Sequence, residues 1–216
     1  MIKISPSILS ADFARLRDEI QRIEHAADWL HVDVMDGHFV PNLTIGPPVV
    51  RAIKKYTNLP LDVHLMMTNP DDFIPLFADS GANYLTVHVE VCHHLHRTVN
   101  EIKKRGMKAG VSLNPATSLS LVEEILGDVD MILIMTVNPG FGGQKFIPAS
   151  LPKIRRLRQQ LEDRQLAHIE IEVDGGISAA NIREVAEAGA TVFVAGSAVF
   201  DSPDPAETIR QMKIAV

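Results

Sequence analysis

Residues 29–41 read WLHVDVMDGHFVP, a short apolar run that ends in a turn. Alternate side chains of a strand share one face, so His31 and Asp33 lie on the same face, with Met35 beside them. The opposite face carries three apolar side chains: Leu30, Val32 and Val34. The stretch therefore predicts a strand buried on both faces that nonetheless places an imidazole next to a carboxylate.

Similar runs recur along the chain and alternate with amphipathic helical patterns. The predicted strands span residues 2–8, 29–35, 59–66, 83–89, 107–113, 130–137, 168–174 and 191–196. The predicted helices span residues 12–26, 46–56, 70–79, 93–105, 118–126, 148–165, 178–188 and 204–214. Such alternation is typical of a parallel sheet. Eight units in one chain of this length favour a closed (β/α)8 TIM barrel, an α/β fold, over an open doubly wound sheet.

Residues typical of helix starts and helix ends support these boundaries. Side chains that accept hydrogen bonds at helix starts precede four of the helices: Asp12, Ser118, Ser178 and Asp204. Glycines stand where three helices would stop before the next strand: Gly81, Gly106 and Gly189. No linker, low-complexity stretch or charge block divides the chain, so residues 1–216 are predicted to form a single barrel domain.

Composition limits the kind of protein. Apolar residues make up 46% and charged residues 22%, an ordinary globular balance. The net charge of -6 argues against nucleic acid and anionic membranes as partners. Cys92 is the sole cysteine, which favours a reducing compartment. With no signal-peptide-like or membrane-spanning stretch, we expect a cytoplasmic enzyme.

Polar residues gather at the predicted strand ends, where a barrel of this kind has its active site. His31 and Asp33 come from the second strand, His64 from the third and Asp174 from the seventh. Uncompensated burial of even one charge is expensive, so a bound cation is the economical explanation. Two imidazoles and two carboxylates suit Zn, Mn, Fe(II) or Co, and the donor set does not choose among them.

Two further carboxylates, Asp62 and Glu172, share faces with His64 and Asp174 and are interpreted as structural.

Glycine-rich loops supply the second half of the predicted site. NPGFGGQ (138–144) follows the sixth strand, DGGI (174–177) the seventh, and AGSAVF (195–200) follows the eighth and opens a short helix. Phosphate in these barrels often binds at the loops after strands 7 and 8. Glycine lets backbone N–H groups approach an anion, which predicts a phosphate site at Gly175, Gly176, Gly196 and Ser197.

Six stretches together resemble the ribulose-phosphate 3-epimerase family over the whole chain: SPSILSADF, HVDVMDGHFVPNLTIGP, LDVHLM, VNPGFGGQKFIP, VDGGI and AGSAVF. The resemblance implies an isomerase of the pentose phosphate pathway with one divalent metal ion per subunit, held by His31, Asp33, His64 and Asp174. Its phosphate loops align with Gly142, Gly143, Gly175, Gly176, Gly196 and Ser197. Substrate contacts are implied for Ser7, Met35, His64, Met66 and Met135.

The implied reaction interconverts D-ribulose 5-phosphate and D-xylulose 5-phosphate at C3. Inverting a carbon next to a ketone needs a proton removed from one face and returned to the other, through an enediolate. The family resemblance gives these two roles to Asp33 and Asp174. We expect a small sugar phosphate as the partner, no nucleic acid or membrane, and a homo-oligomer of unspecified size.

Other functions remain open at this point. A related epimerase could act on a ketohexose 6-phosphate such as allulose 6-phosphate, although Gly176 favours the pentulose. Barrel decarboxylases and aldol-type synthases carry Asp-x-Lys-x-x-Asp on the third strand, whereas residues 62–67 here read DVHLMM, with His64 and Met67 at the lysine and second aspartate positions. A non-catalytic sugar-phosphate-binding barrel would be expected to lose one of the two proton-transfer carboxylates.

Overall fold

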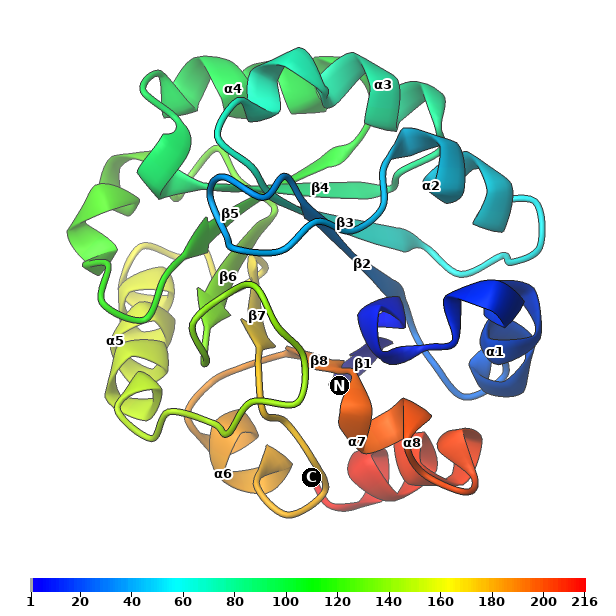
Figure 1. Ribbon diagram of the computed structural model, residues 1–216. Helices are drawn as coiled ribbons and strands as arrows, with labels where there is room; N and C mark the ends of the chain where they lie inside the picture. The colour runs from blue at the N-terminus through cyan, green and yellow to red at the C-terminus, as the bar shows by residue number, and fades with distance from the viewer. Residues whose placement is uncertain (1) are drawn as a thin grey trace.

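The computed structural model describes residues 2–216 and confirms the predicted (β/α)8 barrel (Figure 1). Its eight strands pair in parallel in the order β1-β8-β7-β6-β5-β4-β3-β2. A parallel bridge between Ser7 and His31 brings the two ends of the sheet together, so the sheet curls closed. Met1, the first residue of the predicted domain, lies outside the described residues. The strands are β1 (Lys3–Pro6), β2 (Leu30–Met35), β3 (Leu61–Met66), β4 (Tyr84–His88), β5 (Lys108–Leu113), β6 (Met131–Met135), β7 (Glu170–Asp174) and β8 (Val192–Ala195).

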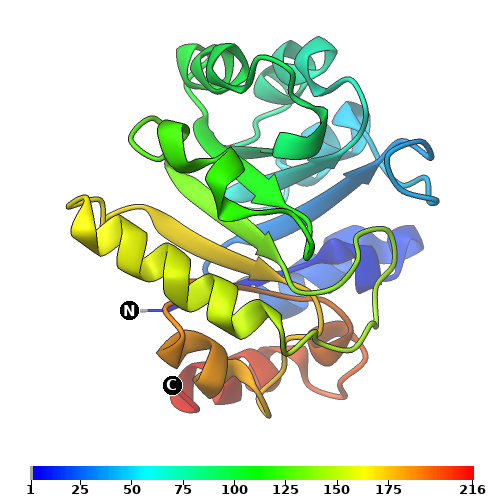
Figure 2. The ribbon, with the colours of Figure 1, turned by 90° about the vertical axis from the view of Figure 1, so that its left-hand side faces the viewer.

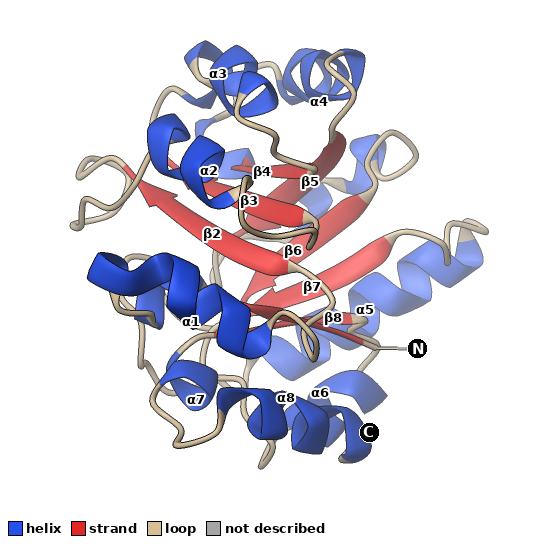
Figure 3. Cartoon of the chain, turned by 90° about the vertical axis from the view of Figure 1, so that its right-hand side faces the viewer, coloured by secondary structure: helices blue, strands red, loops and turns tan. Residues whose placement is uncertain are grey.

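Helices surround the strands on the outside, as the two side views show (Figures 2 and 3). The α-helices are α1 (Leu16–Ile23), α2 (Pro47–Ile53), α3 (Ile74–Asp79), α4 (Leu95–Lys104), α5 (Ser150–Asp163), α6 (Ile182–Glu187), α7 (Ser197–Phe200) and α8 (Pro205–Ile214). Short 3₁₀ turns add to them: η1 (Ile8–Ser10), η2 (Phe13–Arg15), η3 (Pro70–Asp72), η4 (Val89–Val91), η5 (Leu119–Leu121) and η6 (Glu123–Ile125).

The prediction of one helix over residues 118–126 is wrong. Two 3₁₀ turns, η5 and η6, occupy that segment between β5 and β6. Val122 stands between them with φ -116° and ψ -1°, which interrupts the helical backbone. β-branched valine is stiff at χ1 and is a poor helix former, and its side chain is fully buried in the core. Burial of Val122 therefore prevails over helical continuity.

Some of the predicted helix caps are confirmed and others are not. Asp204 caps α8, because its side chain accepts from the Glu207 N–H at 3.0 Å. The side chains of Asp12 and Ser118 cap 3₁₀ turns, η2 and η5. Ser178 does not cap α6: its side chain accepts from Ala180 N–H in a turn ahead of that helix. After α3, α4 and α6 the predicted glycines adopt positive φ, 90°, 81° and 114°, at Gly81, Gly106 and Gly189.

Side chains inside the barrel form layers. The lowest layer is an apolar cluster of Trp29, Met131 and Val192 with Tyr84 packed against it. Above it lies a polar layer that includes four buried side chains: Ser5, His31, Asp62 and Glu172. The outer faces of the strands pack on the helices, so the apolar residues predicted to oppose His31 and Asp33 belong to the main core. Above this polar layer the interior is mixed: the polar side chains at the C-terminal mouth lie beside apolar ones such as Leu133 and Met135.

Among residues 2–216, no helix combines the length and the apolar character needed to cross a membrane.

The packing of α3 yields a stability prediction. Ile74 is fully buried against the barrel, whereas Leu76 of the same helix is 44% exposed. Ile74→Ala should lower the free energy of unfolding by about 2–5 kcal/mol because it leaves a cavity. Leu76→Ala removes the same number of carbons and should change it by less than about 1 kcal/mol. Urea unfolding of both variants checks this, and equal losses would contradict the packing described.

Candidate active site and metal centre

Four polar side chains meet at the C-terminal mouth of the barrel. The parallel register sets Asp33 of β2 opposite His64 of β3, and His31 precedes Asp33 by two residues. Asp174 comes from the end of β7. One donor atom from each of the four lies within 4.8 Å of the others. The structure therefore brings together the complete set that the strand ends suggested.

Asp33 is central to this cluster. Its Oδ1 atom lies 3.3 Å from His31 Nε2 and 3.4 Å from His64 Nδ1. The other oxygen, Oδ2, accepts a hydrogen bond of 2.5 Å from the Ser7 hydroxyl. On the opposite side, Asp174 Oδ2 lies 3.8 Å from His64 Nδ1. One oxygen of Asp33 thus faces the two imidazoles, while the other is held by Ser7, which follows β1.

The donor set fits a divalent metal ion. Within residues 2–216, the buried atoms His31 Nε2 and His64 Nδ1 have no hydrogen-bond partner. Buried polar atoms are normally paired, because leaving them without a partner is costly. Both orphaned nitrogens lie within 3.4 Å of Asp33 Oδ1, an oxygen with which they could share a metal. Mixed nitrogen and oxygen donors suit Zn, Mn, Fe(II) or Co.

Electrostatics of the cluster favour added positive charge. Burial opposes a charge on His31, but Asp62 and Asp33 outweigh it and raise the His31 pKa well above its ordinary value. Burial also opposes ionisation of Asp33, yet His31 and His64 hold its pKa far below the usual range. Burial, and then the charge of Asp33, raise the pKa of Asp174 to about 7. The negative charge of the carboxylates raises the pKa of neighbouring groups, and a bound cation would neutralise the same charge.

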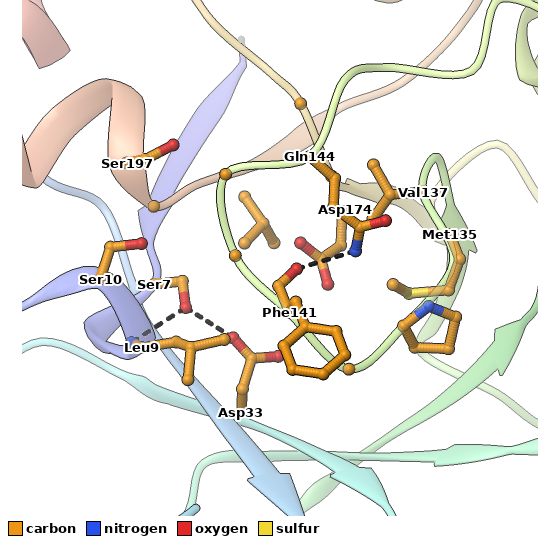
Figure 4. A pocket seen from close by; sticks show the side chains of 18 of the residues that line it. Ser7, Leu9, Ser10, Asp33, Met135, Val137, Phe141, Gln144, Asp174 and Ser197 are labelled. Atoms are coloured by element: carbon orange, nitrogen blue, oxygen red, sulfur yellow. Dashed lines mark hydrogen bonds between the residues drawn. The ribbon is translucent and has the colours of Figure 1, made fainter. Parts of the chain in front are cut away.

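A pocket lies over the two aspartates, and its volume, including the open space at its entrance, is about 550 Å³. Figure 4 shows Asp33 and Asp174 entering it from different strands, with the Ser7 hydroxyl bonded to Asp33. Three methionines from β2, β3 and β6 line its inner wall, and each is at most 3% exposed: Met35, Met66 and Met135. An aliphatic wall next to two carboxylates suits a polar ligand whose reacting carbons must be kept from water.

The predicted phosphate residues line the same pocket: Gly142, Gly143, Gly175, Gly176, Gly196 and Ser197. Gly176 adopts φ +68°, and a Cβ there would lie 2.3 Å from the Phe146 backbone nitrogen, so folding itself requires this glycine. At Gly196 a Cβ would instead meet the Ser10 hydroxyl oxygen, at 2.6 Å. Ser10 and Gly196 therefore form a narrow edge of the pocket.

Several lining residues had no part in the sequence prediction. Ser10 belongs to η1, and Gln144 lies within the loop between β6 and α5. The Gln144 amide donates to the Asn138 carbonyl at 2.6 Å and to the Phe141 carbonyl at 2.9 Å, which closes that loop on itself. Both residues lie in the quoted motifs, but no strand periodicity points them at the site.

The carboxylates interpreted as structural lie beneath the pocket and do not line it. Asp62 Oδ2 is 2.6 Å from His31 Nδ1, and Glu172 Oε1 is 3.7 Å from the same nitrogen. Burial, and then the charge of Asp62, raise the pKa of Glu172 well above its ordinary value. Asp62 therefore contacts the side of the His31 ring that faces away from Asp33.

Comparison with known proteins shows what this chain is similar to. A sequence model of the ribulose-phosphate 3 epimerase family matches residues 3–200. The chain is 53% identical to ribulose-phosphate 3-epimerase of Bacillus subtilis, over 99% of both chains. It is 56% identical to the Synechocystis protein of the same name, over 98% of this chain and 93% of the relative. A 3-hexulose-6-phosphate synthase from Salmonella typhimurium shares the fold at a TM-score of 0.75 and 20% identity, over 99% of this chain and 98% of that one.

The metal centre yields a binding prediction. His31→Ala and His64→Ala each remove one of the two orphaned nitrogens and should abolish stoichiometric binding of Zn²⁺ or Mn²⁺ by the metal-stripped protein. His25→Ala, which changes an exposed histidine, should bind as the parent does. Isothermal titration calorimetry measures both. Undiminished binding by either site variant would rule out that histidine as a ligand.

Proposed function

The chain belongs to the ribulose-phosphate 3-epimerase family and is an isomerase, and we propose that it inverts C3 of D-ribulose 5-phosphate to give D-xylulose 5-phosphate by metal-assisted, two-base proton transfer. One observation carries the proposal: two carboxylates, buried Asp33 from β2 and partly buried Asp174 from β7, line a single pocket. Epimerisation needs a proton-transfer group on each face of a planar intermediate, and a pair of this kind supplies both.

Asp33 and Asp174 are the proposed acid and base. The strands that carry them are separated by β1 and β8 around the barrel, so their side chains approach a bound sugar from different directions. Asp33 removes the C3 proton of one epimer and Asp174 protonates the opposite face, with the roles exchanged in the reverse reaction. Their pKa values are displaced in opposite directions, as is typical of a paired base and acid.

The proposed ligands of the metal are His31, Asp33, His64 and Asp174. A divalent ion bound there would supply Lewis-acid stabilisation of the negative charge that develops on the enediolate oxygens. Ser7 holds the second oxygen of Asp33 in place through its 2.5 Å hydrogen bond.

Substrate contacts are proposed on both sides of the reacting carbon. The soft thioether side chains Met35, Met66 and Met135 pack over the sugar carbons and exclude water. The glycines of the loops after β6, β7 and β8, together with Ser197, bind the 5-phosphate through backbone N–H groups. Anchoring the phosphate makes proton transfer at C3 effectively unimolecular.

The pentulose phosphate is the proposed substrate, and a ketohexose 6-phosphate is the alternative. The family match and the names of the relatives support the pentulose. Assays of both sugars decide the matter, because a higher kcat/KM for allulose 6-phosphate would overturn the assignment. We also propose the cytoplasm as the compartment, on the single cysteine, and a homo-oligomeric assembly.

The two carboxylates yield the first catalytic prediction. Asp33→Asn and Asp174→Asn should each lower epimerisation by roughly 10²–10⁴-fold, because each loses one proton-transfer group. Each variant keeps a base on one face, so one should exchange the C3 proton of ribulose 5-phosphate with deuterated solvent, and the other that of xylulose 5-phosphate. NMR follows the exchange with metal saturated, so that weaker metal binding is not mistaken for a lost base.

The control for this experiment is Asp18→Asn, an exposed aspartate of α1 that should epimerise at the parent rate. A metal-loaded Asp33→Asn or Asp174→Asn variant that turns over as fast as the parent would end the two-base mechanism.

The phosphate loops yield the second prediction. Gly196→Ala places a methyl group against Ser10 at the pocket edge and should raise KM for ribulose 5-phosphate about tenfold, or about 1.4 kcal/mol. Gly127→Ala has no atom within 4 Å of the new methyl and serves as the control. Steady-state kinetics and competition by inorganic phosphate measure the effect. An unchanged KM in the folded variant would place the phosphate elsewhere.

A further inference from the structure

A second hydrogen-bonded histidine lies behind the metal centre. His64 Nε2 is 2.8 Å from Nε2 of His88, which ends β4, and both rings are fully buried. The rings stack with their centroids 4.9 Å apart. A hydrogen bond between two imidazole nitrogens requires that one of them carry the proton and the other be bare. The proton positions of the two rings are therefore linked.

Glu90 of η4 determines which nitrogen is bare. Its Oε2 atom lies 3.1 Å from His88 Nδ1. Its other oxygen, Oε1, accepts from the Asn114 N–H at 2.7 Å and from the Thr117 hydroxyl. Burial opposes its ionisation, but hydrogen bonds from His88, Thr117 and Asn114 lower the pKa of Glu90 to about 2. Glu90 is consequently a pure acceptor, and His88 must place its proton on Nδ1.

We propose that Glu90 and His88 are positioning residues that set the tautomer of His64 for metal binding. With its proton on Nδ1, His88 presents a bare Nε2, which accepts the proton of His64 Nε2. His64 is then bare at Nδ1, the nitrogen that faces Asp33 and Asp174. The inference rests on the proposed metal site and extends it outward from β3 to β4 and η4.

The other imidazole of the centre has a simpler arrangement with the same outcome. His31 Nδ1 lies 2.6 Å from Asp62 Oδ2, which leaves His31 Nε2 for the metal. Each histidine is thus oriented by a carboxylate on its far side, directly for His31 and through His88 for His64. Outer carboxylates of this kind fix the ring and tautomer of metal-binding histidines, and their loss typically weakens metal affinity 10–100-fold.

The hydrogen-bonded chain Glu90–His88–His64 is called the relay here. Glu90→Gln tests it with the least change in side-chain shape. Asn114 N–H and the Thr117 hydroxyl both donate to Oε1 of Glu90, so a glutamine must place its carbonyl oxygen at that position. Its NH₂ group then faces His88 Nδ1 and donates to it. That forces the His88 proton onto Nε2 and the His64 proton onto Nδ1, where it blocks the metal. The substitution should therefore invert the relay while preserving its contacts.

Glu24→Gln is a matched control. Glu24 Oε1 also accepts from one backbone N–H, that of Asn58, and one threonine hydroxyl, that of Thr57, each at 2.9 Å. No hydrogen bond joins Glu24 to a histidine among the contacts of residues 2–216. The same amide replacement there should leave metal binding unchanged.

The experiment measures Zn²⁺ affinity of the metal-stripped protein by competition with a fluorescent chelator. Glu90→Gln should bind roughly 10–100-fold more weakly than the parent, and Glu24→Gln as tightly as the parent. Equal affinity of Glu90→Gln and the parent would overturn the relay. A parent protein that binds no Zn²⁺ would instead overturn the metal site itself, so the two failures are distinguishable.

A measurement on the parent chain needs no variant to fold. The imidazole ¹⁵N shifts of the metal-stripped protein, with His64 and His88 assigned, report which nitrogen carries each proton. The relay requires protonated Nε2 and bare Nδ1 on His64, and the reverse on His88. The opposite pattern on either ring would overturn the proposal, and the predicted pattern would support it independently of any effect on stability.

Discussion

The contact of one buried carboxylate oxygen with imidazoles from two strands is the interaction on which the barrel's interior depends. Asp33 Oδ1 lies within 3.4 Å of nitrogens of both His31 and His64. A carboxylate 5% exposed would be strongly destabilising on its own, so positive charge must come from its neighbours. Register pairing of β2 with β3 delivers both rings to this oxygen. The polar side chains above the Trp29 layer are arranged around that requirement.

The barrel divides its tasks between two arcs of strands. β2, β3 and β4 carry the imidazoles and the groups behind them, while the loops after β6, β7 and β8 carry the glycines. The Asn42 amide joins the arcs by donating to the Gly140 carbonyl at 2.8 Å, and Ser7, which follows β1 between the arcs, bonds Asp33. Because the arcs are held on one closed sheet, the distance between the proposed metal donors and the proposed phosphate loops is constrained by the fold.

Much of this could be predicted because it follows local periodicity. The observed strands all lie inside the predicted ranges, and the i, i+2 rule correctly put His31 and Asp33 on the inner face. Residues 118–126 failed because the burial of Val122, a tertiary effect, overrode helical pattern. Ser10 and Glu90 lie on 3₁₀ turns, η1 and η4, where neither strand nor helix periodicity says which way a side chain points.

The buried polar layer shows why such residues are kept in a core. Replacing a buried ionic group by an apolar one of similar size is often neutral or stabilising, so stability alone does not explain Asp62 beneath His31. An apolar residue at position 62 would leave His31 Nδ1 without an acceptor and free the ring to turn. Glu90 has the same effect on His64 from farther away, through His88. Both carboxylates are therefore best understood as constraints on the proton positions of the rings, which packing alone cannot impose because an imidazole has the same shape in either tautomer.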